Sequence, residues 1–101
     1  QRFFQQRGKE PSPWFTLLAI ANQQDYPRLG LAIAKKHVRR AVDRNRIKRL
    51  IRESFRHNLV LLSGLDIVVL ARKGVENSTN EILTGALNKH WKVLNQRCKE
   101  S

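Results

Sequence analysis

The spacing of apolar and polar positions near the start of the chain predicts two β-strands. The first, Trp14–Ala21, is rich in aromatic and branched side chains, and the polar turn Asn22–Pro27 ends it. The second, Arg28–Ala34, alternates large and small apolar residues on its two faces. Because the connection between them is short, the sequence favours an antiparallel hairpin. The large residues are Leu29, Leu31 and Ile33, and the small ones are Gly30, Ala32 and Ala34.

From about Arg40 to Asn58, apolar residues recur at helical spacing, which predicts an amphipathic helix. Nearly continuous apolar sequence follows at Leu65–Ala71, which predicts an interior strand covered on both faces. A last amphipathic helix is predicted to begin with a capping box, because Glu81 lies three residues after Ser78. The apolar stripe of the first helix comprises Ile47, Leu50, Ile51, Ser54 and Phe55, and that of the last comprises Ile82, Leu83, Ala86, Leu87, Trp91 and Leu94.

The order strand, strand, helix, strand, helix predicts an α+β fold. We expect a two-layer sandwich in which helices pack on a small mixed β-sheet, with a basic helix at its centre. A chain of 101 residues has room for a single domain, spanning residues 1–101. The chain begins at Gln1 and contains no Met. We therefore expect the domain to be truncated at its N-terminus.

The charge of the chain is strongly unbalanced. Twenty Lys and Arg residues against eight Asp and Glu residues give a formal net charge of +12, which indicates a polyanionic partner. No apolar stretch has the length needed to span a bilayer, and no secretory signal opens the chain. Cys98 is the only cysteine and lies outside any metal-ligand spacing. We expect a cytoplasmic protein that binds nucleic acid and not a membrane.

Half of the positive charge lies in the segment Lys35–Arg56. A solvated helix face that keeps the protein soluble is the ordinary explanation for such a run. A solvated face of that kind mixes both signs of charge, whereas charged residues three and four positions apart in this segment mostly carry the same sign of charge. Arg39, Arg40 and Arg44 also crowd the predicted helix N-terminus, where the helix dipole disfavours cations unless an anion is bound. The cationic sector of the helix comprises Asn45, Lys48, Arg49, Arg52 and Arg56.

The Arg residues and Asn45 indicate which parts of a nucleic acid this surface could bind. Arg predominates over Lys on the predicted helix, which favours bidentate phosphate contacts and stacking on bases. Asn45 is a neutral group that could read a base edge or a ribose 2′-OH, with a satisfied surface amide as the alternative. The small face of the second strand could admit an RNA backbone, but a floor beneath a packed helix is the more common arrangement.

No group of residues in the sequence has the spacing of a catalytic or metal site. His37, His57 and His90 are scattered, and there is no Gly-rich phosphate loop. His90 falls on the apolar stripe of the last helix and is predicted to be structural. A DNA-binding helix is one alternative, although such helices usually present Asn, Gln or Ser among their Arg residues. A structural RNA-binding protein, such as a ribosomal protein, is another.

The run Arg28–Phe55, RLGLAIAKKHVRRAVDRNRIKRLIRESF, resembles the signature region of the protein subunit of bacterial ribonuclease P. The hallmark of that family, an Arg-Asn-Arg motif, is found at Arg44, Asn45 and Arg46. The strand and loop Asp66–Gly74, DIVVLARKG, also agree with the family pattern. The resemblance covers most of the chain, and it favours a ribonucleoprotein enzyme over a ribosomal protein.

The resemblance implies a protein that binds a large catalytic RNA and helps it remove the 5′ leader of precursor tRNA. In that family the RNA carries the chemistry with Mg²⁺, so the protein would be a non-catalytic subunit of an endoribonuclease. It would need no catalytic residues of its own and no obligate protein partner. The RNA-binding residues that the resemblance implies are Lys35, Lys36, Arg39, Arg40, Arg44, Asn45, Arg46, Lys48, Arg49 and Arg52.

The family also has a central cleft, between the sheet and an N-terminal helix, that receives the single-stranded leader. Part of that helix lies upstream of the equivalent of Phe3 and Phe4, and this chain starts too late to contain it. A core position is the alternative for the aromatic residues among the cleft candidates and is the one we expect for Phe15. The positions that match the leader-binding cleft are Phe4, Phe15, Leu17, Ile33 and Lys35.

Overall fold

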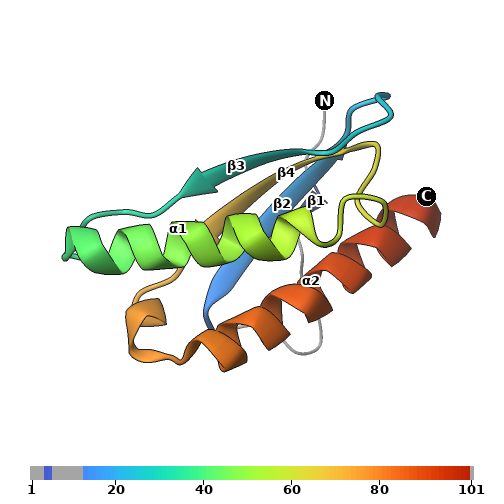
Figure 1. Ribbon diagram of the computed structural model, residues 1–101. Helices are drawn as coiled ribbons and strands as arrows, with labels where there is room; N and C mark the ends of the chain where they lie inside the picture. Colours follow the sequence, from blue (N-terminus) through green and yellow to red (C-terminus); the bar gives the residue numbers. More distant parts are fainter. Residues whose placement is uncertain (1–3, 6–12, 101) are drawn as a thin grey trace.

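A computed structural model of the protein describes residues 4–5 and 13–100. Figure 1 shows a sheet with two helices lying side by side across one of its faces, so the predicted two-layer α+β sandwich is confirmed. No described helix is long and apolar enough to cross a membrane. The elements are β1 (Phe4–Gln5), β2 (Phe15–Ala21), β3 (Arg28–Ala32), α1 (Ala41–Arg56), β4 (Leu65–Ala71), the 3₁₀ turn η1 (Val75–Asn77) and α2 (Asn80–Glu100).

The sheet is mixed, as predicted, but its strand order differs from the expected hairpin. The order is β1-β2-β4-β3, with β2 antiparallel to β4 and β3 parallel to β4. The predicted antiparallel pairing of β2 with β3 is therefore wrong, because β4 lies between them. Three of the four strands lie where the sequence predicts them, although β2 begins at Phe15 and not at Trp14, and β3 ends at Ala32 and not at Ala34. The sequence did not predict β1.

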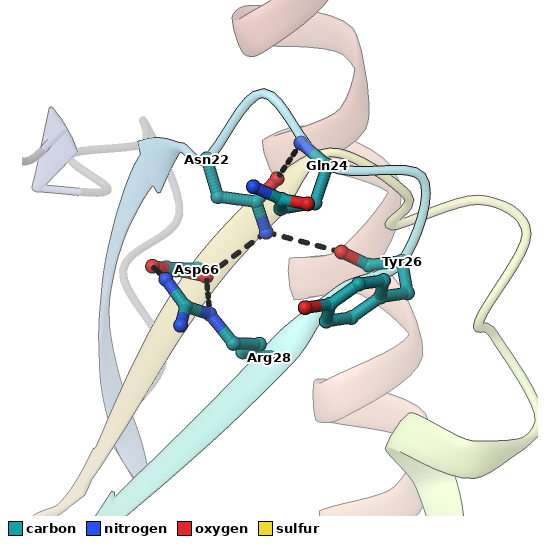
Figure 2. A network of polar contacts seen from close by, with 5 residues as sticks. All are labelled: Asn22, Gln24, Tyr26, Arg28 and Asp66. Atoms are coloured by element: carbon teal, nitrogen blue, oxygen red, sulfur yellow. Dashed lines mark hydrogen bonds and ion pairs between the residues drawn. The ribbon is translucent and has the colours of Figure 1, made fainter.

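A polar network at one end of the sheet joins β2, β4 and β3 (Figure 2). Asn22, just after β2, donates a hydrogen bond of 2.9 Å to Asp66 Oδ1, near the start of β4. Arg28, at the start of β3, donates to both carboxylate oxygens of Asp66, at 2.7 and 2.6 Å. These contacts lower the pKa of Asp66, first through Arg28 and then through Asn22. Asp66 thus links the end of β2 and the start of β3 to β4, which lies between them.

Asn22 also shapes the loop between β2 and β3. Its side-chain oxygen accepts a hydrogen bond of 2.8 Å from the backbone N–H of Gln24, and its amide donates one of 3.0 Å to the carbonyl of Tyr26. Gln23, between these contacts, takes a left-handed conformation with φ of 59°. Figure 2 shows the side chain of Asn22 between the loop and Asp66. The polar turn that the sequence predicts is therefore a specific connector, which lets the chain pass over β4.

One face of the sheet carries the core, and the other is only half-buried. Along β4, buried residues alternate with half-buried ones, so the prediction that this strand is covered on both faces is wrong for the described residues. Gly30 and Ala32 pair with Val68 and Leu70 of the half-buried face. A Cβ on Gly30 would lie 3.6 Å from Val68 Cγ2. The small face of β3 is therefore not a floor beneath either helix.

The helices bury the stripes that the sequence predicts, with two corrections. Ile47, Ile51 and Ser54 of α1 are buried, and Leu50 and Phe55 pack against the core. On α2 the stripe runs through Leu83, Leu87, Trp91 and Leu94, but Ile82 is 53% exposed and does not belong to it. The helix α1 also begins one residue later and ends two residues earlier than the predicted range 40–58.

The N-terminal cap of α2 is one residue later than the predicted capping box. The helix begins at Asn80, and the Oγ1 of Thr79 accepts a hydrogen bond of 3.3 Å from the backbone N–H of Ile82. Ser78, the predicted cap, is buried, and its hydroxyl has no hydrogen-bond partner among the described residues. Thr79 and not Ser78 therefore satisfies one of the free amides at the start of α2.

Candidate nucleic-acid interface

The rotation of α1 about its axis is fixed by its buried side. Trp91 of α2 donates a hydrogen bond of 2.8 Å from its indole Nε1 to the Oγ of Ser54. The ring of Trp91 also lies edge-on to that of Phe55, with centroids 6.0 Å apart. Because these contacts and the buried isoleucines hold one side of α1 against the protein, the opposite side faces outward. That outward side is the predicted cationic sector.

Four residues of the predicted sector come together in one open depression, which we call the α1 hollow. Among the described residues, Lys48, Arg49 and Arg52 make no ion pair, whereas Arg56 binds Glu53 at 2.7 Å. Arg52 lies about one helical turn from both Lys48 and Arg49, a spacing at which like charges repel. A bound anion would remove this repulsion. The α1 hollow is lined by Asn45, Lys48, Arg49, Arg52 and Glu53.

The segment that leads into α1 carries further exposed cations. Lys35 and Lys36 lie in a turn after β3, and Arg39 and Arg40 follow directly before the helix; all four side chains are exposed. Arg40 is the N-cap residue and makes no capping hydrogen bond with its side chain. The first turn of α1 therefore presents free N–H groups next to these cations, an arrangement suited to an anion.

Arg44 is turned back toward the chain that precedes the helix. Its Nη1 donates to the carbonyl oxygens of Val38, at 2.9 Å, and Arg39, at 2.8 Å. Val38 is itself fully buried in the core. Arg44 thus fixes the direction in which the chain enters α1, a role that its place in the Arg-Asn-Arg motif does not reveal.

Arg46 is turned to the other side, toward the start of α2. Its Nη2 donates to the carbonyl oxygens of Glu76, at 2.9 Å, and Ser78, at 3.3 Å. Its Nη1 donates to the side-chain oxygen of Asn80. Arg44 and Arg46 are both half-buried, whereas Asn45 between them is exposed. The structure therefore brings Asn45 together with the cations of the α1 hollow but gives both motif arginines partners within the protein.

A further pair of exposed cations was not among the predicted site residues. Arg72 and Lys73 follow β4 in the turn completed by Gly74, whose φ is 92°. Because β3 and β4 are parallel, the segments after them emerge at the same edge of the sheet, where α1 also begins (Figure 1). The only sequence signal for this pair is its place in the DIVVLARKG stretch, since two charges in a turn are unremarkable by themselves.

The residues matched to a leader-binding cleft do not form one surface. Phe15 and Leu17 are 2% and 0% exposed and belong to the core, so their assignment to an open cleft is wrong and the core position expected for Phe15 is confirmed. Ile33 is half-buried against the core, and Lys35 is exposed. Phe4 lies in β1 and pairs with Ala19. The half-buried face of β2 is formed instead by the intervening residues Thr16, Leu18 and Ile20.

His90 has the structural position that the sequence predicts. It is 8% exposed, and burial lowers its pKa to about 4. Its ring lies edge-on to that of Phe15, with centroids 6.5 Å apart. Within the part of the chain that the structure describes, no three His, Cys, Asp or Glu residues are grouped so that they could hold a metal ion. The exposed cations of α1 and of the segment before it suit the binding of anions.

Known proteins are similar to this chain in sequence and in fold. The chain matches the Ribonuclease P family over residues 1–95. The ribonuclease P protein component of Pseudoalteromonas translucida is 49% identical over 98 residues, which are 97% of this chain and 70% of that protein. The corresponding protein of Pseudomonas aeruginosa is 56% identical over 87 residues, which are 86% of this chain and 64% of that protein.

Solved structures agree with these relatives. The RNase P protein of Staphylococcus aureus superimposes with a TM-score of 0.78 at 29% identity, covering 91% of this chain and 81% of that one. The RNase P protein of Thermotoga maritima, in complex with 1-(4-fluorophenyl)-2-thiourea, gives a TM-score of 0.76 at 29% identity, covering 89% of this chain and 84% of that one. From its sequence, its fold and the basic helix that crosses its sheet, the chain belongs to the family of bacterial ribonuclease P protein components.

Proposed function

We propose that this protein supports ribonuclease P without supplying the catalytic groups, by binding the RNA that cleaves precursor tRNA. The observation that carries the proposal is the α1 hollow, in which Lys48, Arg49 and Arg52 face outward with no ion pair among the described residues. Helix α1 also begins with free N–H groups beside Arg39 and Arg40. RNA phosphates are the anions that neutralise such a surface.

The chemical step belongs, in this proposal, to the RNA and to Mg²⁺ held mainly by the RNA. Protein cations close to the RNA backbone reduce the repulsion between phosphates, so fewer Mg²⁺ ions are needed to keep the RNA folded and the substrate bound. The protein therefore contributes affinity for the RNA and for precursor tRNA. Its effect is expected to be greatest when Mg²⁺ is scarce.

We further propose that the single-stranded 5′ leader lies on the half-buried face of the sheet, opposite the helices. Leu18 and Val68 present apolar surface on this face of β2 and β4. Gly30 and Ala32 of β3 add little bulk beside them, which lets a nucleic acid backbone approach closely. These positions replace Phe15 and Leu17 as candidates for leader contacts.

Reconstitution with the cognate ribonuclease P RNA tests the proposal. The full-length protein alone is expected to leave precursor tRNA intact, whereas protein and RNA together should cleave it at a Mg²⁺ concentration at which the RNA alone is inactive. A Lys48→Ala, Arg49→Ala, Arg52→Ala triple variant should need more Mg²⁺ than the natural protein. A Lys89→Ala, Lys92→Ala variant, altered at exposed positions of α2, is the control. Cleavage by the protein without RNA would overturn the proposal.

A further inference from the structure

The Arg-Asn-Arg motif is divided by the structure into residues that face the protein and one that faces outward. We propose that Arg44 and Arg46 are positioning residues, which act on RNA binding through the fold. Asn45 is then the member of the motif that touches RNA, together with the cations of the α1 hollow. This inference rests on the proposed function, because it assigns roles within the same RNA-binding surface.

The contacts of Arg46 support a positioning role. Its guanidinium donates to three oxygens, from Glu76 and Ser78 of the segment that joins β4 to α2 and from Asn80, the first residue of α2. No carboxylate is among the three acceptors, so the charge of Arg46 is solvated by carbonyl dipoles and is not neutralised. A planar fork with several donors suits this arrangement, whereas the point charge of a Lys does not.

Arg44 acts on the opposite side of the helix. It binds the carbonyls of Val38 and Arg39 and so holds the segment that carries the exposed cations in front of α1. Successive helical residues are separated by 100°, so the side chains on either side of Asn45 point in clearly different directions. The two arginines therefore reach back to the incoming chain and across to α2, respectively.

Asn45 is left on the outward side by this division. It lines the α1 hollow with Lys48 and Arg49, which lie one helical turn further along. Its amide offers both a donor and an acceptor, which suits a base edge or a ribose 2′-OH, while the cations suit phosphates. The hollow thus combines charge with one neutral group that can discriminate between RNA elements.

The test compares substitutions that separate charge from geometry. Arg46→Lys keeps the positive charge but loses the planar guanidinium group with its several donors. Asn80→Ala removes one of the acceptors of Arg46 without changing any residue of α1. Asn88→Ala, at an exposed position of α2, is the matched control. Each full-length variant is measured for its thermal midpoint and for its affinity for the cognate ribonuclease P RNA over a range of salt concentrations.

A positioning role for Arg46 predicts that Arg46→Lys lowers the thermal midpoint by about 5 to 10 °C. Asn80→Ala should lower it by a smaller amount in the same direction. Both variants should bind RNA a few-fold more weakly with the salt slope unchanged, since no phosphate contact is lost. Arg49→Ala should do the reverse, keeping the midpoint and reducing the slope by roughly 0.7 to 0.9.

The opposite pattern overturns the inference. If Arg46 binds a phosphate directly, Arg46→Lys and Asn80→Ala will keep the thermal midpoint of the Asn88→Ala control, and Arg46→Ala will reduce the salt slope as much as Arg49→Ala does. The thermal measurements need no RNA. A natural protein that failed to bind the RNA would therefore contradict the proposed function alone, and the midpoints would still decide the role of Arg46.

Discussion

His90 is a titratable side chain in an apolar place. Burial on α2 lowers its pKa from 6.5 to about 4, because the charged imidazolium is poorly solvated there. Between these two values the unfolded chain takes up a proton at this residue and the folded protein does not. Acid therefore favours unfolding over this interval, and the contribution levels off below pH 4.

We expect the protonation of His90 in the unfolded chain to lower the free energy of unfolding by about 2 kcal/mol as the pH decreases from 7 to 4. This loss is somewhat smaller than the full shift of the His90 pKa implies. Urea unfolding at a series of pH values measures this loss. His90→Phe should make the profile flatter between pH 4 and 6.5. An equally steep profile in His90→Phe would assign the acid sensitivity to other groups.

The role of a residue could be predicted from the sequence where it depends on whether the side chain is buried. It could not be predicted where it depends on the direction in which an exposed or half-buried side chain points. The apolar stripe of α1 identifies Ile47 and Ile51 as core residues, and it leaves the cationic sector outward. Arg44 and Arg46 are as basic as Arg49, so composition cannot separate them. Their partners are carbonyl groups brought near by the fold, which leave no trace in the sequence.

Among the elements, the start of α2 depends on a single hydroxyl. Thr79→Ala removes the acceptor for the N–H of Ile82 and is expected to lower the free energy of unfolding by about 1 kcal/mol. Ser78→Ala should have the opposite or no effect, because the buried Ser78 hydroxyl has no hydrogen-bond partner among the described residues. Thermal or urea unfolding of the two variants compares them directly. A larger loss in Ser78→Ala would restore the capping box that the sequence predicts.

The position of every long element could be predicted from the sequence, whereas the order of the strands could not. A short loop between β2 and β3 normally closes a hairpin, and hydrophobic periodicity carries no information about which strand is the neighbour of which. The polar contacts that link the three strands join residues far apart in sequence, since Asn22 and Arg28 both bind Asp66. Gly30 and Ala32 were the only sequence signal for the half-buried face of the sheet. Their small size was compatible both with the approach of an RNA backbone and with a helix packed on that face.

On the scale of the whole molecule, positive charge accumulates at the edge of the sheet where α1 begins. The turn with Lys73 lies at this edge with the segment that carries Lys35 and Lys36. If about five phosphates are neutralised by this surface, the logarithm of the RNA association constant should fall by roughly 3.5 to 4.5 per tenfold increase in salt.

We expect Lys73→Ala to reduce that slope by about 0.7 to 0.9, as for the loss of one phosphate contact. Lys92→Ala, at an exposed position of α2, should leave it unchanged. Filter binding or fluorescence titration with the cognate RNA, repeated across salt concentrations, measures both slopes. Equal slopes in the two variants would confine the RNA surface to α1 and the segment before it.

The strand order also constrains how the protein is made. β4 pairs with both β2 and β3, yet it is synthesised after both of them and after the whole of α1. While the ribosome is still adding these residues, the two earlier strands lack their central neighbour, and the basic helix has no completed sheet to pack on. Such long-range pairing has to wait until β4, which ends at Ala71, has been synthesised. The sheet that supports the basic helix is therefore completed only after the helix itself has been synthesised.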